Sequence, residues 1–167
     1  MTEHVLLLRA VNVGGRNTVV MADLRALLEQ LGHTGVRTVL NTGNAVFTSD
    51  REDHEVLAGE VEGGLRALGV EVRACVRSPA QLRAAVDAVP GDLPPYVLIC
   101  VLLAEPASLV DVVGRPFPDV DVRAGEGVLY LGYAEGVGRS KLTASWLERR
   151  LGVPTTSRTP ATLRKLL

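Results

Sequence analysis

The pattern of hydrophobic and polar residues predicts strands and helices in a recurring order. The chain opens with an unbroken apolar run at residues 5–8, which is typical of a strand covered on one or both faces. Leucines spaced as i, i+3, i+4 and i+7 then predict a helix over residues 21–31 that is ended by Gly32. Short strand-like runs at 36–41 and 45–48 flank a turn and predict a β-hairpin.

The remainder of the first half predicts a helix, a strand and a second helix. Ser49 and Glu52 have the spacing of a capping box, which places the first of these helix starts at Ser49. Residues 70–77 alternate between apolar and polar, as a half-buried strand does. A serine, a proline and a glutamine within residues 78–81 predict the next helix start.

The same order begins again after a segment rich in proline and glycine at residues 90–95. The second half predicts, in order, a strand at 96–103, a short helix at 106–113, a hairpin of 120–123 with 128–133, a helix capped by Ser140, a strand at 153–157 and a closing helix that starts at Thr159-Pro160.

Each half therefore has the order β-α-β-β-α-β-α, which predicts an α+β fold of two ferredoxin-like units with internal duplication. The predicted units span residues 1–90 and 96–167, with a short linker at 91–95, packed as one compact protein. In such a unit the first and third strands are central and antiparallel. We therefore expect the loop at 12–17 and the turn at 41–44 to open at one end of the sheet and to converge.

The chain has 167 residues, of which 47% are hydrophobic, and this is enough to bury a substantial core. The formal net charge of −1 gives no overall basic character, so it does not predict a long nucleic-acid footprint. Periodicity assigns to the core Leu6, Leu8, Leu24, Leu28, Val46, Leu98, Val101, Leu142, Trp146 and Leu147.

Cysteines and histidines are few and give no sign of a metal site. Cys75 and Cys100 lie in strand-like segments, and His4, His33 and His54 lack metal-ligand spacing, so we expect buried thiols, ordinary histidines, no disulfide, no metal and no cofactor. The N-terminus shows neither a long apolar segment nor a basic leader, so we expect a cytoplasmic protein without a membrane partner.

The loop after the first strand is the first candidate site. Its glycines favour positive φ and close backbone approach, its arginine suits a carboxylate or phosphate, and its asparagines add neutral donors and acceptors. The alternative is a Gly-Gly turn whose asparagines satisfy their own backbone. With the neighbouring arginine and the facing turn, the predicted ligand-binding residues are Arg9, Asn12, Gly14, Gly15, Arg16, Asn17 and Asn44.

A second candidate cluster comprises Arg139, Ser140, Lys141 and Arg158. If Ser140 caps a helix, the free N–H groups of the first turn and the helix dipole favour an anion there. The alternative is that Lys141 points into solvent or pairs with Glu135. Whether the two clusters merge depends on how the halves pack.

Familiar catalytic and nucleotide motifs are incomplete in this sequence. Residues 136–141 resemble a phosphate loop but lack its G-K-[ST] ending, and residues 12–15 do not form a G-x-G-x-x-G fingerprint. Trp146 has helical spacing with Leu142, which favours core packing. Aromatic residues make up only 4% of the chain, too few for the stacking surface of a single-strand binder.

Five segments together resemble the bacterial domain-of-unknown-function family numbered 1697. They are LLRAVNVGGRN at 7–17, MADLR at 21–25, TGNAVF at 42–47, RSKL at 139–142 and VPTTSR at 153–158. The resemblance implies a small α+β protein of ferredoxin-like units and supplies no activity. This chain has Arg9-Ala10 where the family usually has Arg-Gly, and Arg158-Thr159-Pro160 where it usually has Arg-Asn-Trp.

Three classes of function follow from these residues. The favoured one is a binding module for an anionic ligand, phosphorylated, nucleotide-like or a short nucleic-acid segment. The second is an enzyme acting on an anionic small molecule in the same cleft, for which no general base is evident. The third is a protein-interaction module that uses exposed strand edges. The sequence leaves the oligomeric state open.

Overall fold

A computed structural model describes residues 1–12, 15 and 17–167. The chain forms two compact units, Met1–Leu82 together with Lys165–Leu167, and Arg83–Arg164. The division falls upstream of the predicted linker at 91–95. Each unit has its own antiparallel sheet, of four and five strands respectively, so the fold is α+β. Among the helices described, none is long and apolar enough to cross a membrane.

The first half has the predicted order of elements. They are β1 (Thr2–Leu8), α1 (Met21–Gln30), β2 (Thr34–Val39), β3 (Asn44–Ser49), α2 (His54–Ala67), β4 (Ala74–Arg77) and α3 (Pro79–Asp87). The sheet order is β2-β3-β1-β4, and every pairing in it is antiparallel. The first and third strands are therefore central, as expected.

Of the two helix starts that capping residues predicted in this half, one is confirmed and one is wrong. At α3 the capping box is confirmed, because Ser78 N–H donates to Gln81 Oε1 at 2.9 Å and Gln81 N–H donates to Ser78 Oγ at 3.2 Å. The predicted start of α2 at Ser49 is wrong, because β3 extends through Ser49 and pairs it with Thr2. Asp53 is the N-cap instead, and its carboxylate accepts from two backbone N–H groups.

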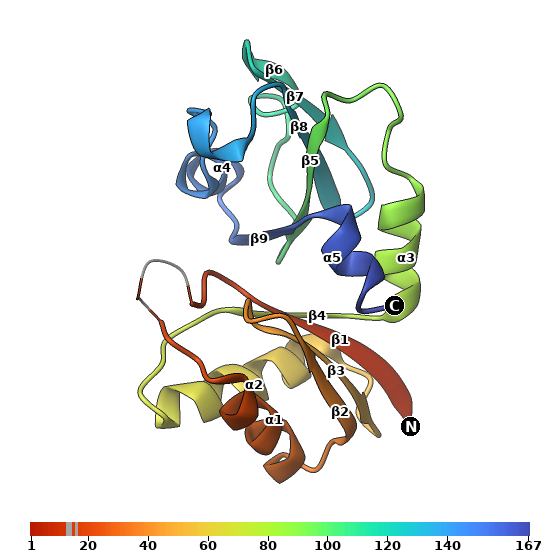
Figure 1. Ribbon diagram of the computed structural model, residues 1–167, viewed down its shortest axis with the longest axis vertical. Helices are drawn as coiled ribbons and strands as arrows, with labels where there is room; N and C mark the ends of the chain where they lie inside the picture. Colours follow the sequence, from red (N-terminus) through yellow and green to blue (C-terminus); the bar gives the residue numbers. More distant parts are fainter. Residues whose placement is uncertain (13–14, 16) are drawn as a thin grey trace. The chain divides into compact units, whose positions relative to one another are not determined.

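The core of the first unit lies between its sheet and the helices α1 and α2, which cover the same face of the sheet (Figure 1). Leu6 and Leu8 of β1 contribute to this core, and Leu24 and Leu28 of α1 pack against them. The unbroken apolar run of β1 is explained by burial on both faces of the sheet, since residues 4–8 are all buried.

The second half departs from the predicted order. Its elements are β5 (Tyr96–Leu102), β6 (Gly114–Phe117), β7 (Val120–Ala124), β8 (Val128–Tyr133), a 3-10 turn η1 (Val137–Arg139), α4 (Ala144–Leu151), β9 (Thr155–Arg158) and α5 (Pro160–Arg164). The sheet order is β6-β7-β8-β5-β9. The predicted hairpin is β7–β8, and Pro160 opens α5 as expected.

The predicted helix over 106–113 is wrong. Only a single turn forms there, in which the N–H groups of Val112 and Val113 donate to the carbonyl of Leu109. The segment contains three valines within four residues, which disfavours helix, and Val110 is 85% exposed, so there is no continuous buried face to stabilise further turns. The chain instead adds β6 to the edge of the sheet.

The predicted helix start at Ser140 is also wrong. Helix α4 begins at Ala144, and Thr143 is its N-cap, accepting from the N–H of Trp146 at 3.2 Å. Ser140 lies at the end of η1, and its hydroxyl accepts from the N–H of Leu142. Leu142 is buried outside the helix, and this anchors the chain in a non-helical conformation until Thr143.

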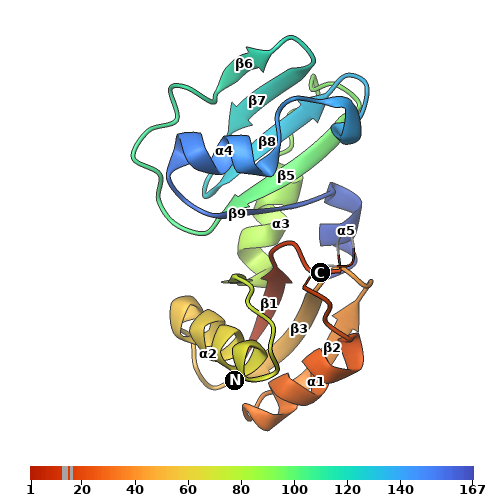
Figure 2. The ribbon, with the colours of Figure 1, turned by 90° about the vertical axis from the view of Figure 1, so that its left-hand side faces the viewer.

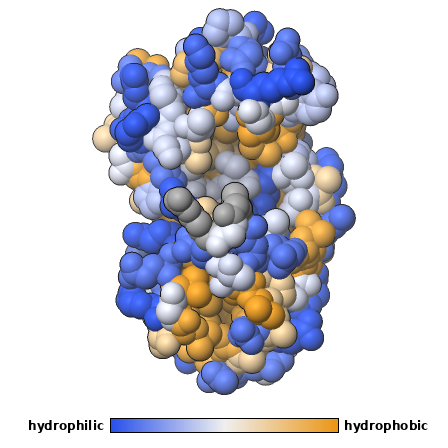
Figure 3. All heavy atoms as spheres, turned by 60° about the vertical axis from the view of Figure 1, so that its left-hand side comes forward, coloured by the Kyte–Doolittle hydropathy of each residue, from blue (hydrophilic) through white to orange (hydrophobic). Residues whose placement is uncertain are grey.

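The core of the second unit lies between its sheet and α4, which crosses the sheet in Figure 2. Of the residues predicted for the two cores, Leu98 and Trp146 are only partly buried, and all the others are buried. The exposed large apolar residues are distributed along the chain, and Figure 3 shows apolar and hydrophilic residues interspersed on one face. Such scattered exposure is normal for a protein surface.

Candidate functional site

The loop after β1 and the turn between β2 and β3 meet, as the topology predicted. Asn12 joins them: its Nδ2 donates to the carbonyl oxygen of Asn41 at 3.0 Å and to Asn41 Oδ1 at 3.1 Å. The same side chain closes the loop on itself, donating to Val19 O and accepting from Val19 N–H, both at 2.9 Å. The base of the loop is therefore fixed to the hairpin turn.

Backbone strain is concentrated at this junction. In the part of the chain that the structure describes, four residues other than glycine have positive φ: Ala10 (51°), Asn12 (56°), Asn17 (49°) and Leu40 (60°). Three belong to the loop and the fourth to the facing turn. The left-handed conformation costs an L-residue roughly 1–2 kcal/mol, so the surrounding contacts must hold this geometry in place.

Two predicted ligand-binding asparagines have structural roles. Asn12 uses its amide to close the loop, as described above. Asn44 is fully buried, and its Nδ2 donates to Val39 O at 3.0 Å and to Thr42 Oγ1 at 2.7 Å. Gly15 has the positive φ that the sequence suggested, +73°. The predicted residues Gly14 and Arg16 lie outside the described residues.

Arg9 and Asn17 line a polar cleft in the first unit. The cleft has a volume of about 290 Å³, and its other lining residues are Glu62, Arg66, Glu71, Val72 and Arg73. Pairing of β1 with β4 builds it: Leu8 is opposite Ala74, and one residue further along, the N–H of Arg9 donates to the carbonyl of Arg73 at 2.9 Å. Residues far apart in sequence therefore line one cavity.

Three guanidinium groups and two carboxylates line this cleft, which leaves one net positive charge. Arg66 pairs with Glu71 at 3.2 Å, but the two side chains are 63% and 80% exposed, so the pair contributes only about 0–1 kcal/mol. Arg73 pairs with Glu62 at 3.2 Å. Glu62 is more strongly fixed, because it is 18% exposed and also accepts from the N–H of Ala74.

Sequence reasoning missed Glu62, Arg66, Glu71 and Arg73 as site residues. A signal was available for Arg73, because the predicted topology pairs the first and fourth strands and so brings the residues beside their ends together. No such signal existed for Glu62 and Arg66, whose position depends on how α2 packs on the sheet.

The second predicted cluster has a different local structure from the one expected. Arg139 and Ser140 lie at η1, and Lys141 is exposed before α4 rather than in its first turn. The helix-dipole argument for an anion beside Lys141 therefore does not apply. Arg158, at the end of β9, donates to Thr156 Oγ1 at 2.8 Å and to Ser157 O at 2.9 Å.

Two histidines pack against Phe47 and the third packs against one of them, although nothing in their sequence spacing suggested it. The ring of Phe47 lies 4.6 Å from that of His33 and 5.5 Å from that of His4, which in turn lies 5.4 Å from His54. His4 and His33 are buried, and the Nδ1 of His4 and the Nε2 of His33 have no hydrogen-bond partner in the described structure. No metal-binding group of three or more His, Cys, Asp or Glu side chains occurs among the described residues.

Burial lowers the pKa of His33, and the positive charge of Arg51 lowers it further; Glu60 opposes this effect, and His4 adds a smaller lowering effect. The pKa of His54 is also lowered, first by burial. These two imidazoles therefore favour the neutral form more strongly in the folded protein than in the unfolded chain.

Comparisons with known proteins place the chain in a family and give a fold but no activity. A family model described as "Protein of unknown function (DUF1697)" matches residues 1–130, a segment that contains every lining residue of the polar cleft. No curated protein matches the chain. The conserved bacterial protein SP0830 from Streptococcus pneumoniae has a similar structure, with a TM-score of 0.72 and 20% identity over 99% of this chain and 96% of that one.

Proposed function

Because the chain belongs to the DUF1697 family, whose function is unknown, we propose a function from its own geometry: the polar cleft of the first unit binds a small anionic ligand. The ligand class is a phosphorylated or nucleotide-like compound. The observation that carries the proposal is the convergence of Arg9, Arg66 and Arg73 on one cleft beside a strained loop.

The charges of the cleft favour an anion that replaces Glu71 in its weak ion pair with Arg66. Glu71 is largely solvated, so a phosphate or carboxylate oxygen replaces it on Arg66 at little cost. Glu62 is itself held by the N–H of Ala74 and orients the 60% exposed side chain of Arg73 through their ion pair. A guanidinium held in this way loses less conformational entropy when it binds a planar or tetrahedral oxyanion.

The loop supplies the neutral part of the recognition. Asn17 lines the cleft, and it belongs to a loop whose base is held closed by the side chain of Asn12. Strained backbone held by its surroundings is common at ligand sites because it presents groups before the ligand arrives. The cleft volume of about 290 Å³ is near the lower limit for small-molecule sites, which favours a compact ligand.

A thermal-shift screen of inorganic phosphate, nucleotides, sugar phosphates and short oligonucleotides tests the proposal. We expect saturable stabilisation by at least one phosphorylated class. Calorimetric titration of that compound should show affinity reduced at least about tenfold in Arg9→Gln, because a hydrogen bond to a charged group contributes about 1.5–3 kcal/mol.

The matched control is Arg25→Gln, which removes the same charge from an exposed position on α1 of the same unit. Equal affinities in the wild type, the Arg9 variant and the Arg25 variant would show that binding depends on general charge rather than on the cleft. Absence of saturable binding across all the phosphorylated classes would refute the proposal itself.

We also propose that the two units are ferredoxin-like and related by duplication. The order β2-β3-β1-β4 of the first sheet recurs as β7-β8-β5-β9 in the second, with β6 added at the edge. In both units a helix leads into the edge strand that closes this order: α2 connects β3 to β4 in the first unit, and α4 connects β8 to β9 in the second. This agreement of order and connection supports duplication where the residues themselves show little similarity.

A further inference from the structure

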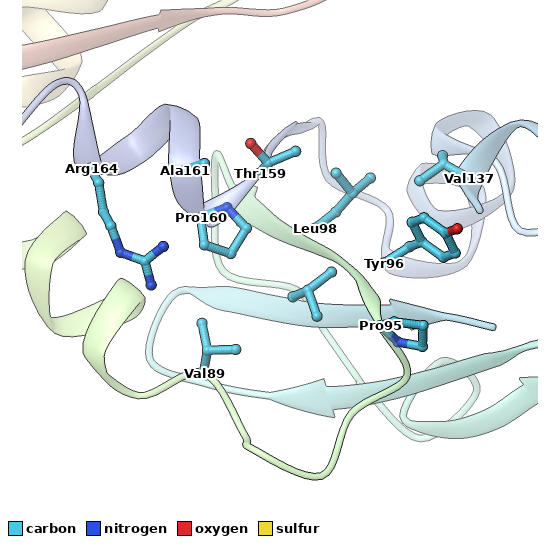
Figure 4. A pocket seen from close by; sticks show the side chains of 10 residues that line it. Val89, Pro95, Tyr96, Leu98, Val137, Thr159, Pro160, Ala161 and Arg164 are labelled. Carbon is cyan, nitrogen blue, oxygen red and sulfur yellow. The ribbon is translucent and has the colours of Figure 1, made fainter. Parts of the chain in front are cut away.

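A second cleft lies entirely within the residues of the second unit, and its lining is mainly apolar. It has a volume of about 490 Å³ and is bordered by Val89, Tyr96, Leu98, Val137, Pro160 and Arg164, among others (Figure 4). This volume is within the range of sites that hold small organic ligands. The cleft shares no residue with the polar cleft of the first unit.

Two of its apolar side chains are unusually exposed. Tyr96 is 55% exposed and Val137 is 42% exposed, and Leu98, which periodicity assigned to the core, is only partly buried. An apolar ligand would cover these surfaces at once, and each square ångström of apolar surface removed from water contributes roughly 25 cal/mol. The aromatic ring of Tyr96 also offers a flat face for contact with a chain or ring.

Arg164 gives the cleft a single charged group. In Figure 4, Arg164 and Val89 lie at one end of the view, whereas Tyr96 and Val137 lie at the other. Among the described residues, no carboxylate pairs with Arg164, whereas Arg66 and Arg73 of the first unit each pair with a glutamate. A cation at one end of an apolar cleft is complementary to a molecule with an apolar body and an anionic end.

We propose that this cleft binds an amphipathic organic monoanion, with its carboxylate or sulfonate on Arg164 and its apolar body along Leu98, Pro160 and Tyr96. The small side chain of Ala161, on the first turn of α5, leaves room for that body. This site is separate from the proposed anion site of the first unit and does not depend on it.

Fluorescence titration with 1-anilinonaphthalene-8-sulfonate, an aromatic sulfonate, tests the site, followed by displacement with octanoate and with octanol. We expect saturable binding to the wild type, with octanoate displacing the probe at a concentration at least about tenfold lower than octanol, because only octanoate carries the charge. Arg164→Gln should remove this difference between the two competitors.

Ala161→Phe should weaken probe binding at least about tenfold by filling the cleft, since a phenyl group occupies space that the ligand needs. Arg149→Gln is the matched control, because Arg149 is exposed on α4 and does not line the cleft. Melting curves identify any variant that binds the probe through unfolding. Unchanged affinity in both cleft variants, or equal displacement by octanoate and octanol, would overturn the proposal.

Discussion

Mild acid is expected to destabilise the first unit through His33 and His54. Burial lowers the pKa of His33 and of His54 below the ordinary value of 6.5. His4 and Arg77 add positive charge beside His54, and Asp53 opposes them less strongly. In the unfolded chain these influences are absent, so the unfolded state binds protons at a higher pH than the folded state does.

The sign and size of the effect follow from that difference. As pH falls below about 6.5 the unfolded chain takes up protons that the folded unit still excludes, so the free energy of unfolding falls. Each histidine contributes a slope of up to about 1.4 kcal/mol per pH unit, and two contribute up to about 2.7 kcal/mol per pH unit. The loss of stability ends below the pKa values that the two histidines have in the folded protein, where both states are charged. Above about pH 7.5 their contribution to stability is constant. Ordinary carboxylates have pKa values of about 3.9–4.3 and so titrate below this window.

Urea unfolding followed by far-ultraviolet circular dichroism, at pH 7.5, 6.5 and 5.5, measures this slope. Trp146 belongs to the second unit, so its fluorescence in the same experiment reports the other sheet separately. His33→Phe replaces the buried imidazole by a ring that does not titrate and should reduce the slope by about half. Stability that stays constant or rises between pH 7.5 and 5.5 would show that the folded unit does not exclude protons from these histidines.

Three substitutions test the packing and the strained junction, each by equilibrium urea unfolding. Leu28→Ala should cost about 2–5 kcal/mol because Leu28 is fully buried in the first core; a cost below 1 kcal/mol would contradict that burial. Ala10→Gly should stabilise the unit by up to about 1 kcal/mol, because glycine adopts the φ of 51° without strain, although it also gives the unfolded chain more entropy. A destabilised variant would show that Ala10 is unstrained. Gly43→Ala should lower the free energy of unfolding by at least about 2 kcal/mol, because the φ of residue 43 is +76° and the added Cβ would lie 2.5 Å from Val11 Cγ2 and 2.7 Å from Leu8 Cβ. Wild-type stability of this variant would mean that the turn can move.

The elements that sequence reasoning predicted correctly are those whose signals are local. Helix α1 followed from its leucine spacing, and α3 followed from the reciprocal cap of Ser78 and Gln81. The starts of α2 and α4 did not follow, because Ser49 is held in a strand by Thr2 and the chain after Ser140 is held in a non-helical conformation by burial of Leu142. Tertiary contacts therefore shifted each helix start to a later cap, Asp53 for α2 and Thr143 for α4.

The candidate site was predictable only as far as topology could specify it. Strand order correctly brought the loop after β1 to the turn before β3, which is now seen in the contact between Asn12 and Asn41. Strand order could not show that the Asn12 side chain is used to close the loop. It also could not show that Arg66 approaches the cleft from the end of α2, because that depends on packing between helix and sheet.

The most direct test of anion binding in the polar cleft is an NMR titration of the isotope-labelled protein with inorganic phosphate at constant pH and ionic strength. We expect saturable shifts of the backbone amides of Arg9, Asn17 and Arg73 and of the Arg66 side-chain Nε–H, while Arg25 on α1 stays unchanged. Saturable shifts confined to other residues, or weak linear shifts of the same size at Arg25 and Arg73, would show that the cleft does not bind the anion.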